Sequence, residues 1–122
     1  MSTPESHVLR ACMTYLRLCG IACWRINVTG VPLAGQPGRF RKAPSKGIAD
    51  ILGIAERECD CEHLGCKDPL PLAVECKAPK GRQSPAQREF QQAWEGAGGL
   101  YVLARSVDEL RNGLRDAGVE TK

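Results

Sequence analysis

Apolar residues near the start of the chain recur every three or four positions, which is the spacing of one face of a helix. Thr3 suits the N-cap of this helix, Pro4 suits its first position, and Gly20 suits its end. The pattern therefore predicts an amphipathic first helix. Its apolar stripe consists of Val8, Leu9, Cys12, Met13 and Leu16.

The apolar pattern then changes to short runs, which are typical of strands. Residues 21–28 alternate well enough to form a first strand, and the Gly- and Pro-rich residues 29–47 are typical of a long loop. Residues 48–55, 72–76 and 100–104 are three further apolar runs of strand length. Four strands are therefore expected.

A second helix is indicated between the third and fourth strands. Ser84, Pro85 and Gln87 form a capping-box start, and Gly98 can end the helix. Helical spacing predicts a buried face on it. The residues of that face are Phe90, Ala93, Trp94 and Ala97.

A third helix is predicted after the fourth strand, because Ser106 and Glu109 repeat the capping-box spacing and Gly118 can end the helix. The predicted order of elements is therefore α-β-β-β-α-β-α. We expect an α/β fold in one domain, residues 1–122, with a mixed central sheet flanked by helices.

Length and charge are consistent with one domain of ordinary size. The chain has 122 residues, and 17 Lys and Arg against 14 Asp and Glu give a net charge of +3. This excess is compatible with a polyanionic partner but too small to identify one. No apolar stretch has the length of a membrane span and the N-terminus lacks the features of a signal peptide, so we expect a cytoplasmic location and no membrane partner.

The chain has seven cysteines, an odd number, and its N-terminus lacks an export signal. Both features favour reduced thiols over disulfides. A polar insertion at about residues 56–71 contains the segment "CDCEHLGC". In it Cys59, Cys61, His63 and Cys66 supply four ligands, enough for a tetrahedral Zn²⁺ site. Such a site would be structural, because a closed shell of four protein ligands leaves no position for water. A loop of reduced thiols without metal is the alternative.

The third predicted strand ends in charged residues. Side chains alternate across a strand, so Glu75 and Lys77 share one face while Cys76 points to the other. Asp50 lies early in the second strand, and a hairpin between these strands would bring its carboxylate beside Glu75. Two neighbouring carboxylates are suitable ligands for Mg²⁺ or Mn²⁺. A solvated strand end with an incidental ion pair is the simpler interpretation of the charges.

A family resemblance rests on three segments. "GIADILGI", "VECKAPKGRQSPAQREF" and "GAGGLYVLARSVDEL" together resemble the VRR-NUC domain, a virus-type replication and repair nuclease module of the PD-(D/E)XK superfamily. The resemblance covers nearly the whole chain, and it implies a restriction-endonuclease-like core. One departure is Ala49, which stands where the superfamily has proline. Because that proline only shapes the start of the strand, the departure leaves the chemistry intact.

The resemblance also implies roles for individual residues. Asp50 and Glu75 would bind the metal together with the backbone carbonyl of Cys76, and Lys77 would serve the attacking water. Glu5 corresponds to an acid that reaches the site from the first helix. Gln87 corresponds to a glutamine that lines the site, although its position in the capping box is a sufficient reason for a glutamine there. An acid at a helix N-terminus, such as Glu5, likewise has a structural explanation.

Basic residues precede and follow the proposed metal site in the sequence. They are Arg39, Arg41, Lys42 and Lys46 before Asp50, and Lys80, Arg82 and Arg88 after Glu75. Such residues bind phosphates without reading sequence. With the resemblance, they predict a Mg²⁺- or Mn²⁺-dependent DNA endonuclease that selects branched DNA, such as Holliday junctions or flaps. The family further implies a homodimer, a role in DNA repair and a phage or prophage source.

Two other functions are compatible with the sequence. A non-catalytic DNA-binding module would bind DNA equally well with and without Mg²⁺. A small zinc-dependent DNA-binding regulator would lose its fold on chelation and would not cleave DNA. Neither accounts for the paired acids Asp50 and Glu75.

Overall fold

A computed structural model describes residues 3–26, 31–32, 40–41, 46–59, 61–62 and 65–122 of the protein. Its elements in chain order are α1 (Pro4–Leu18), β1 (Ala22–Arg25), β2 (Val31–Pro32), β3 (Phe40–Arg41), β4 (Ile51–Glu58), β5 (Lys67–Cys76), α2 (Pro85–Gly96), β6 (Leu100–Ala104) and α3 (Val107–Asp116). The result is a mixed α/β fold. Apart from the short β2–β3 pair, the order is the predicted α-β-β-β-α-β-α.

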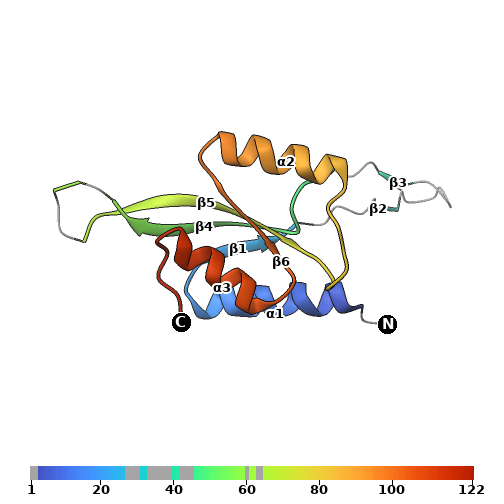
Figure 1. Ribbon diagram of the computed structural model, residues 1–122, viewed down its shortest axis with the longest axis horizontal. Helices are drawn as coiled ribbons and strands as arrows, with labels where there is room; N and C mark the ends of the chain where they lie inside the picture. The colour runs from blue at the N-terminus through green and yellow to red at the C-terminus, as the bar shows by residue number, and fades with distance from the viewer. Residues whose placement is uncertain (1–2, 27–30, 33–39, 42–45, 60, 63–64) are drawn as a thin grey trace.

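Four strands form one mixed sheet in the order β1-β4-β5-β6. β1 and β5 are both antiparallel to β4, whereas β6 is parallel to β5 and is reached through α2. Figure 1 shows α2 on one side of this sheet and α1 and α3 on the other. The sheet is therefore the middle layer of three, with its two faces covered by different helices.

The predicted helix starts are confirmed. Thr3 caps α1 and Ser84 caps α2, each within a complete capping box. Ser106 caps α3, but the Glu109 carboxylate accepts from the Arg105 N–H instead of closing a box. Among the described residues no helix is long and apolar enough to cross a membrane.

The larger core lies between the sheet and the pair α1 and α3. It contains the predicted α1 residues Cys12, Met13 and Leu16, together with Val74 and Cys76 of β5. Side chains on this face of β5 alternate with side chains that face α2, as a strand requires. Cys76 is thus a core residue, although its two neighbours in sequence are charged.

The smaller core under α2 corrects one prediction. Phe90 and Trp94 stack with ring centroids 5.4 Å apart and pack toward Tyr101, but both remain partly exposed. Ala93 and Ala97, predicted to be buried, are exposed. The helix contacts the sheet mainly through its two aromatic side chains, so its apolar stripe is covered only in part.

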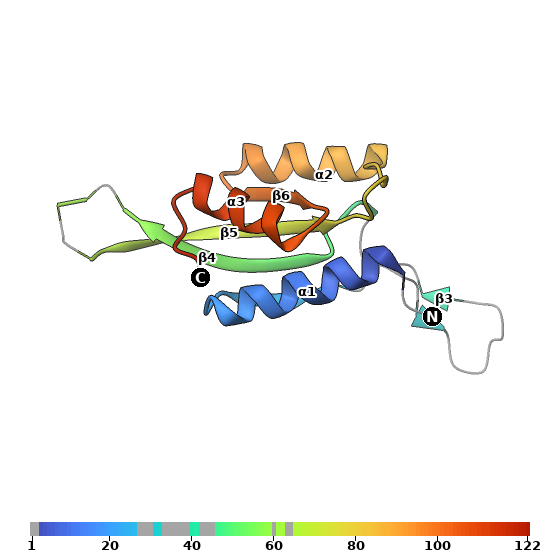
Figure 2. The same ribbon diagram turned by 60° about the horizontal axis from the view of Figure 1, so that its bottom comes forward.

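The β4–β5 hairpin corrects the predicted insertion at residues 56–71. The strands are paired in register from Ile51↔Val74 to Glu58↔Lys67, so only a tip at residues 59–66 remains between them. Figure 2 shows this hairpin extending beyond the helices. The outer residues of the hairpin are polar because both faces of the ribbon are exposed. The apolar pattern therefore did not predict this part of the two strands, which is held by backbone hydrogen bonds.

Candidate active site

Strand register brings together the two acids that the sequence singled out. Asp50 immediately precedes β4, and the pair Ile51↔Val74 places it beside Glu75. The Cys76 N–H donates to Asp50 Oδ2 at 2.8 Å, and the Ile26 N–H donates to the Asp50 carbonyl at 2.8 Å. The Asp50 side chain and backbone are therefore both held by neighbouring strand ends.

A third acid reaches this point from the other side of the sheet. Glu5 lies in the first turn of α1, and one carboxylate oxygen each from Glu5, Asp50 and Glu75 lie within 4.8 Å of one another. We call these three residues the carboxylate site. The placement of Glu5 agrees with the prediction, because the helix N-terminus and both strand ends meet at the same edge of the sheet.

Glu75 is the most buried member of the carboxylate site, with 2% of its surface exposed. Burial first, and then the charges of Asp50 and Glu5, raise the pKa of its carboxyl group to about 8, while the charge of Lys77 opposes this shift. Its Oε2 atom has no hydrogen-bond partner among the described residues. A buried, unpartnered oxygen among three acids fits a bound cation, which would stabilise the charged carboxylates.

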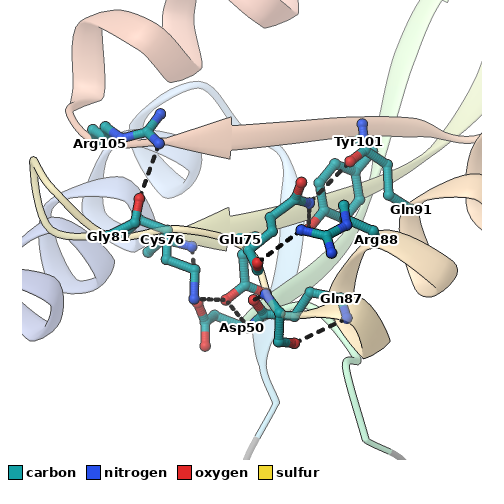
Figure 3. A network of polar contacts seen from close by, with 12 residues as sticks. Asp50, Glu75, Cys76, Gly81, Gln87, Arg88, Gln91, Tyr101 and Arg105 are labelled. Atoms are coloured by element: carbon teal, nitrogen blue, oxygen red, sulfur yellow. Dashed lines mark hydrogen bonds and ion pairs between the residues drawn. The ribbon is translucent and has the colours of Figure 1, made fainter.

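Gln87 makes two contacts, one in the cap of α2 and one at the carboxylate site. Its Oε1 accepts from the Ser84 N–H at 2.8 Å and so completes the capping box of α2. Its Nε2 donates to Glu75 Oε1 at 3.1 Å, from the helix toward the strand (Figure 3). One side chain thus couples the start of α2 to the orientation of the buried carboxylate.

Lys77 lies next to the carboxylate site on the same face as Glu75, as strand alternation predicted. Its Nζ is 3.8 Å from Glu75 Oε1, and only 9% of the residue is exposed. Its backbone N–H donates to the Ala104 carbonyl of β6 at 3.0 Å. Beyond it, the Arg105 side chain donates to the Gly81 carbonyl at 3.0 Å and holds the following loop (Figure 3).

An open pocket of about 610 Å³ leads to these residues. It is lined by Glu5, Lys46, Gly47, Ile48, Asp50, Glu75 and residues 84–87. Gly47 has a φ of +81°, and a Cβ atom there would collide with the Ala86 carbonyl oxygen. The close approach of the two backbones therefore requires glycine, and it places Lys46 at the wall of the pocket.

The predicted phosphate-binding residues are placed in part. Lys46 lines the pocket, and Lys80, Arg82 and Arg88 are exposed on the segment that follows Glu75. Arg88 also donates to the Gln83 carbonyl at 3.2 Å. Arg41 lies in β3 without a described side chain, and Arg39 and Lys42 lie outside the described residues.

The structure adds a basic group that sequence reasoning missed. Arg10, Arg17 and Arg25 line a pocket of about 280 Å³ together with Ser6, Leu9 and Met13, and we call these three arginines the arginine pocket. None of the three forms an ion pair within the described parts of the chain. Two residues of this pocket are sequence neighbours of residues at the carboxylate site. Ser6 follows Glu5, and Arg25 precedes Ile26, whose N–H donates to the Asp50 carbonyl. The arginine pocket therefore adjoins the carboxylate site.

Only the seven-residue spacing of Arg10 and Arg17 on one helix face could have suggested the arginine pocket from sequence. Arg25 joins them because β1 packs beside α1. That packing depends on the strand order of the sheet.

Three of the four predicted zinc ligands converge at the far end of the hairpin. One Sγ each of Cys59, Cys61 and Cys66 lies within 4.8 Å of the other two, and we call these residues the thiol cluster. The Cys59 N–H donates to the Cys66 carbonyl at 3.1 Å. Hydrogen bonding with the other two cysteines raises the pKa of the Cys66 thiol to about 12. His63, the fourth predicted ligand, lies outside the described residues.

Both groups of side chains are compatible with a metal ion, and their donor atoms differ. The carboxylate site offers hard oxygen ligands, and the thiol cluster offers soft sulfur ligands. Comparisons with known proteins assign neither group: no family model, no curated protein and no solved structure matches the chain.

Proposed function

We propose that the protein is a metal-dependent nuclease of the PD-(D/E)XK type, with a restriction-endonuclease-like core of the VRR-NUC kind. The observation that carries this proposal is the convergence of Glu5, Asp50 and Glu75, with Lys77 Nζ 3.8 Å from Glu75. Three acids with one lysine suit phosphodiester hydrolysis, because the acids hold a cation and the lysine offsets phosphate charge.

The metal assigned to the carboxylate site is Mg²⁺ or Mn²⁺, since both prefer oxygen ligands and retain waters. Asp50 and Glu75 would hold it with the Cys76 carbonyl and with Glu5. The hydrogen bonds to Asp50 Oδ2 and Glu75 Oε1 use one oxygen of each carboxylate, so the second oxygen of each would be the one to bind the cation. A divalent cation supplies Lewis-acid polarisation of the phosphate and a water of lowered pKa.

The other residues position the reactants. Lys77 holds its ammonium group beside Glu75, where it can orient the attacking water and offset charge that develops on the phosphate. Gln87 fixes the Glu75 carboxylate by donating to Oε1. Burial of Glu75 and Lys77 keeps these charges in a low-dielectric environment, where electrostatic interactions are stronger than in water.

The proposed substrate is DNA, bound through its phosphates on both sides of the carboxylate site. Lys46, Lys80, Arg82 and Arg88 are exposed near one side, and the arginine pocket adjoins the site through Ser6 and Arg25. These groups would position a duplex without reading its bases. Selection of branched DNA, including Holliday junctions and flaps, and a role in DNA repair are expectations from the family resemblance.

A candidate contact surface for the proposed homodimer lies on the sheet face beside α2. Trp24 pairs with Leu52 in the register of β1 and β4, and Ile54 lies two residues further along β4, so the three share the sheet face beside α2. Trp24 is 56% exposed and Ile54 is 50% exposed. Tyr101, by contrast, belongs to the core under α2. Light scattering of the wild-type protein and Trp24→Ser would test this surface.

The central test compares cleavage by the wild-type protein and by Glu75→Gln. Labelled linear duplex, flap and four-way junction DNA are incubated with each protein in Mg²⁺, in Mn²⁺ and in EDTA. We expect metal-dependent cleavage by the wild type and its loss in the variant, because a charged metal ligand is removed. Glu95→Gln, an exposed substitution on α2, is the matched control and should cleave normally.

The outcomes of this test separate the alternatives. Cleavage of branched DNA in preference to duplex would support structure selectivity. DNA binding without cleavage under every metal condition would overturn the nuclease proposal and favour a binding module. Unchanged cleavage by Glu75→Gln would remove the carboxylate site from the mechanism.

A further inference from the structure

The thiol cluster lies far from the carboxylate site along the same hairpin. Cys59 follows Asp50 by nine positions, which corresponds to about 30 Å at the rise of an extended strand. Figure 1 shows the end of β4 and the start of β5 on the side opposite the N-terminus of α1. Any ligand at the tip is therefore independent of the proposed nuclease chemistry.

Three sulfur atoms gather there from a very short stretch of chain. The Sγ atoms of Cys59 and Cys61 are 2.7 Å apart, and that of Cys66 completes a group within 4.8 Å. Tetrahedral zinc with Zn–S bonds of about 2.3 Å requires sulfur atoms about 3.7 Å apart, so small side-chain rotations would fit the ion. Thiolates select Zn²⁺ over Mg²⁺ or Ca²⁺, which prefer oxygen ligands.

Backbone pairing already closes the loop that the metal would need. Glu58 pairs with Lys67, and the Cys59 N–H donates to the Cys66 carbonyl at 3.1 Å, so the first and last cysteines are held across the ribbon. Gly65 has a φ of +79°, which turns the chain back toward Cys66. The hairpin thus presents the thiols together without help from the distant core.

We propose that Cys59, Cys61 and Cys66 bind one zinc ion that closes the tip of the β4–β5 hairpin. Three thiolates occupy three positions of the tetrahedron. The described residues supply these three ligands, and His63, the fourth ligand predicted from the sequence, lies outside them. The ion is structural: its site is separate from the carboxylate site, and a two-stranded ribbon without a core gains stability from a metal that joins its ends.

The first test measures metal bound to the full-length protein. Protein purified without chelator, from medium containing zinc, is analysed by native mass spectrometry and by elemental analysis. We expect one zinc per chain in the wild type and in Cys19→Ser, a matched control outside the cluster. Cys66→Ser should weaken zinc binding by more than about 100-fold, since even outer-shell partners contribute 10–100-fold.

A second measurement identifies the ligands. Cobalt(II) titrated into zinc-free, reduced protein should give intense visible absorption and a sulfur-to-cobalt charge-transfer band that are lost in Cys59→Ser and Cys66→Ser. His63→Ala should alter the visible band if histidine is the fourth ligand and leave it unchanged if solvent is. Either result supports the three-thiolate site.

The proposal is overturned if the reduced wild type takes up neither zinc nor cobalt above the level of Cys66→Ser. It is also overturned if the purified protein carries a disulfide within the cluster and stays metal-free after reduction and addition of zinc. Removal of zinc should increase tryptic cleavage at Arg57 and Lys67, which flank the tip, while the far-ultraviolet spectrum of the helices persists. None of these results depends on whether the protein cleaves DNA.

Discussion

The two ends of the β4–β5 hairpin carry two ligand groups that differ in their donor atoms and in how far apart their residues lie in the sequence. At one end, Glu5, Asp50 and Glu75 converge from widely separated parts of the sequence and from two layers of the fold. At the other end, the thiol cluster comes from eight consecutive residues at an exposed tip. The first group requires the whole fold, whereas the second requires only a turn.

This difference determines how each group is held. Glu75 is buried, hydrogen-bonded to Gln87 from α2 and paired with Lys77, so its position depends on packing between layers. The thiol cluster is held by the Cys59–Cys66 backbone hydrogen bond and by adjacent strand pairing. Packing around a ligand group in the core can change the pKa and the orientation of its side chains. A ligand group at a hairpin tip mainly joins two strands.

Among substitutions that keep all three acids of the carboxylate site, Gln87→Glu is expected to have the largest effect on cleavage. The new carboxylate can still accept from the Ser84 N–H, but it replaces the donor to Glu75 with a charge. We expect cleavage to fall by about 10–100-fold, as for other residues that orient metal ligands. Cleavage kinetics in Mg²⁺ measure this effect, and zinc content should be unaffected.

Gln92→Glu is the control for this prediction, because it makes the same change at an exposed position of α2. It should cleave at the wild-type rate. If Gln87→Glu also cleaved at that rate, the hydrogen bond to Glu75 would have no role in positioning the carboxylate.

The second prediction concerns pH and stability in the absence of divalent metal. The pKa of Glu75 is raised from 4.5 to about 8 in the folded protein, so the folded state binds more protons than the unfolded state between these values. Its contribution to the free energy of unfolding is therefore full below pH 4.5 and is lost as pH rises to about 8. Thermal unfolding at several pH values measures this slope.

Glu75→Gln should remove that part of the slope, and Mg²⁺ should reduce it in the wild type by favouring the charged carboxylate. Equal pH dependence in the wild type and the variant would contradict the raised pKa. Because Glu75→Gln changes a single carboxyl group, the difference between the two slopes isolates the carboxylate end of the hairpin.

A smaller effect is expected at the arginine pocket. Removing one phosphate contact with Arg17→Ala should weaken DNA binding several-fold and reduce the salt dependence of binding by about one unit. Fluorescence anisotropy with Glu75→Gln as the background avoids cleavage during the measurement. Arg115→Ala, an exposed arginine of α3, should bind as the background does. An identical salt dependence in both variants would exclude Arg17 from the DNA path.

The smallest effect is expected at the opposite end of the hairpin. Cys66→Ser should leave Mg²⁺-dependent cleavage of a short duplex within about twofold of the wild type, because distant sites act additively. Initial rates measure this directly. A large loss of cleavage in the variant, with an unchanged circular dichroism spectrum, would show that the two ends are coupled.

Local signals in the sequence were sufficient for much of the fold. The caps at Thr3 and Ser84 were predicted because capping depends on residues within one turn. The hairpin placed Asp50 beside Glu75 because pairing of neighbouring strands is a simple topology. Glu5 was identified only through the family resemblance, since nothing in its local sequence distinguishes a ligand from an acid at a helix start.

The remaining features depend on packing that the sequence does not encode locally. The strands extend to Glu58 and Lys67 because backbone pairing continues after the apolar pattern has ended. Ala93 and Ala97 remain exposed because helical periodicity gives the direction of a face and not the extent of its cover. Arg25 joins the arginines of α1 only after β1 is placed at the edge of the sheet.

The alternation along β5 has a consequence for how this chain tolerates mutation. Val74 and Cys76 point into the main core, whereas Glu75 and Lys77 point into the candidate site. A saturation library across these four positions should therefore show a two-residue rhythm. Substitutions at Val74 and Cys76 would reduce the amount of folded protein. Substitutions at Glu75 and Lys77 would yield abundant, inactive protein that still competes for substrate.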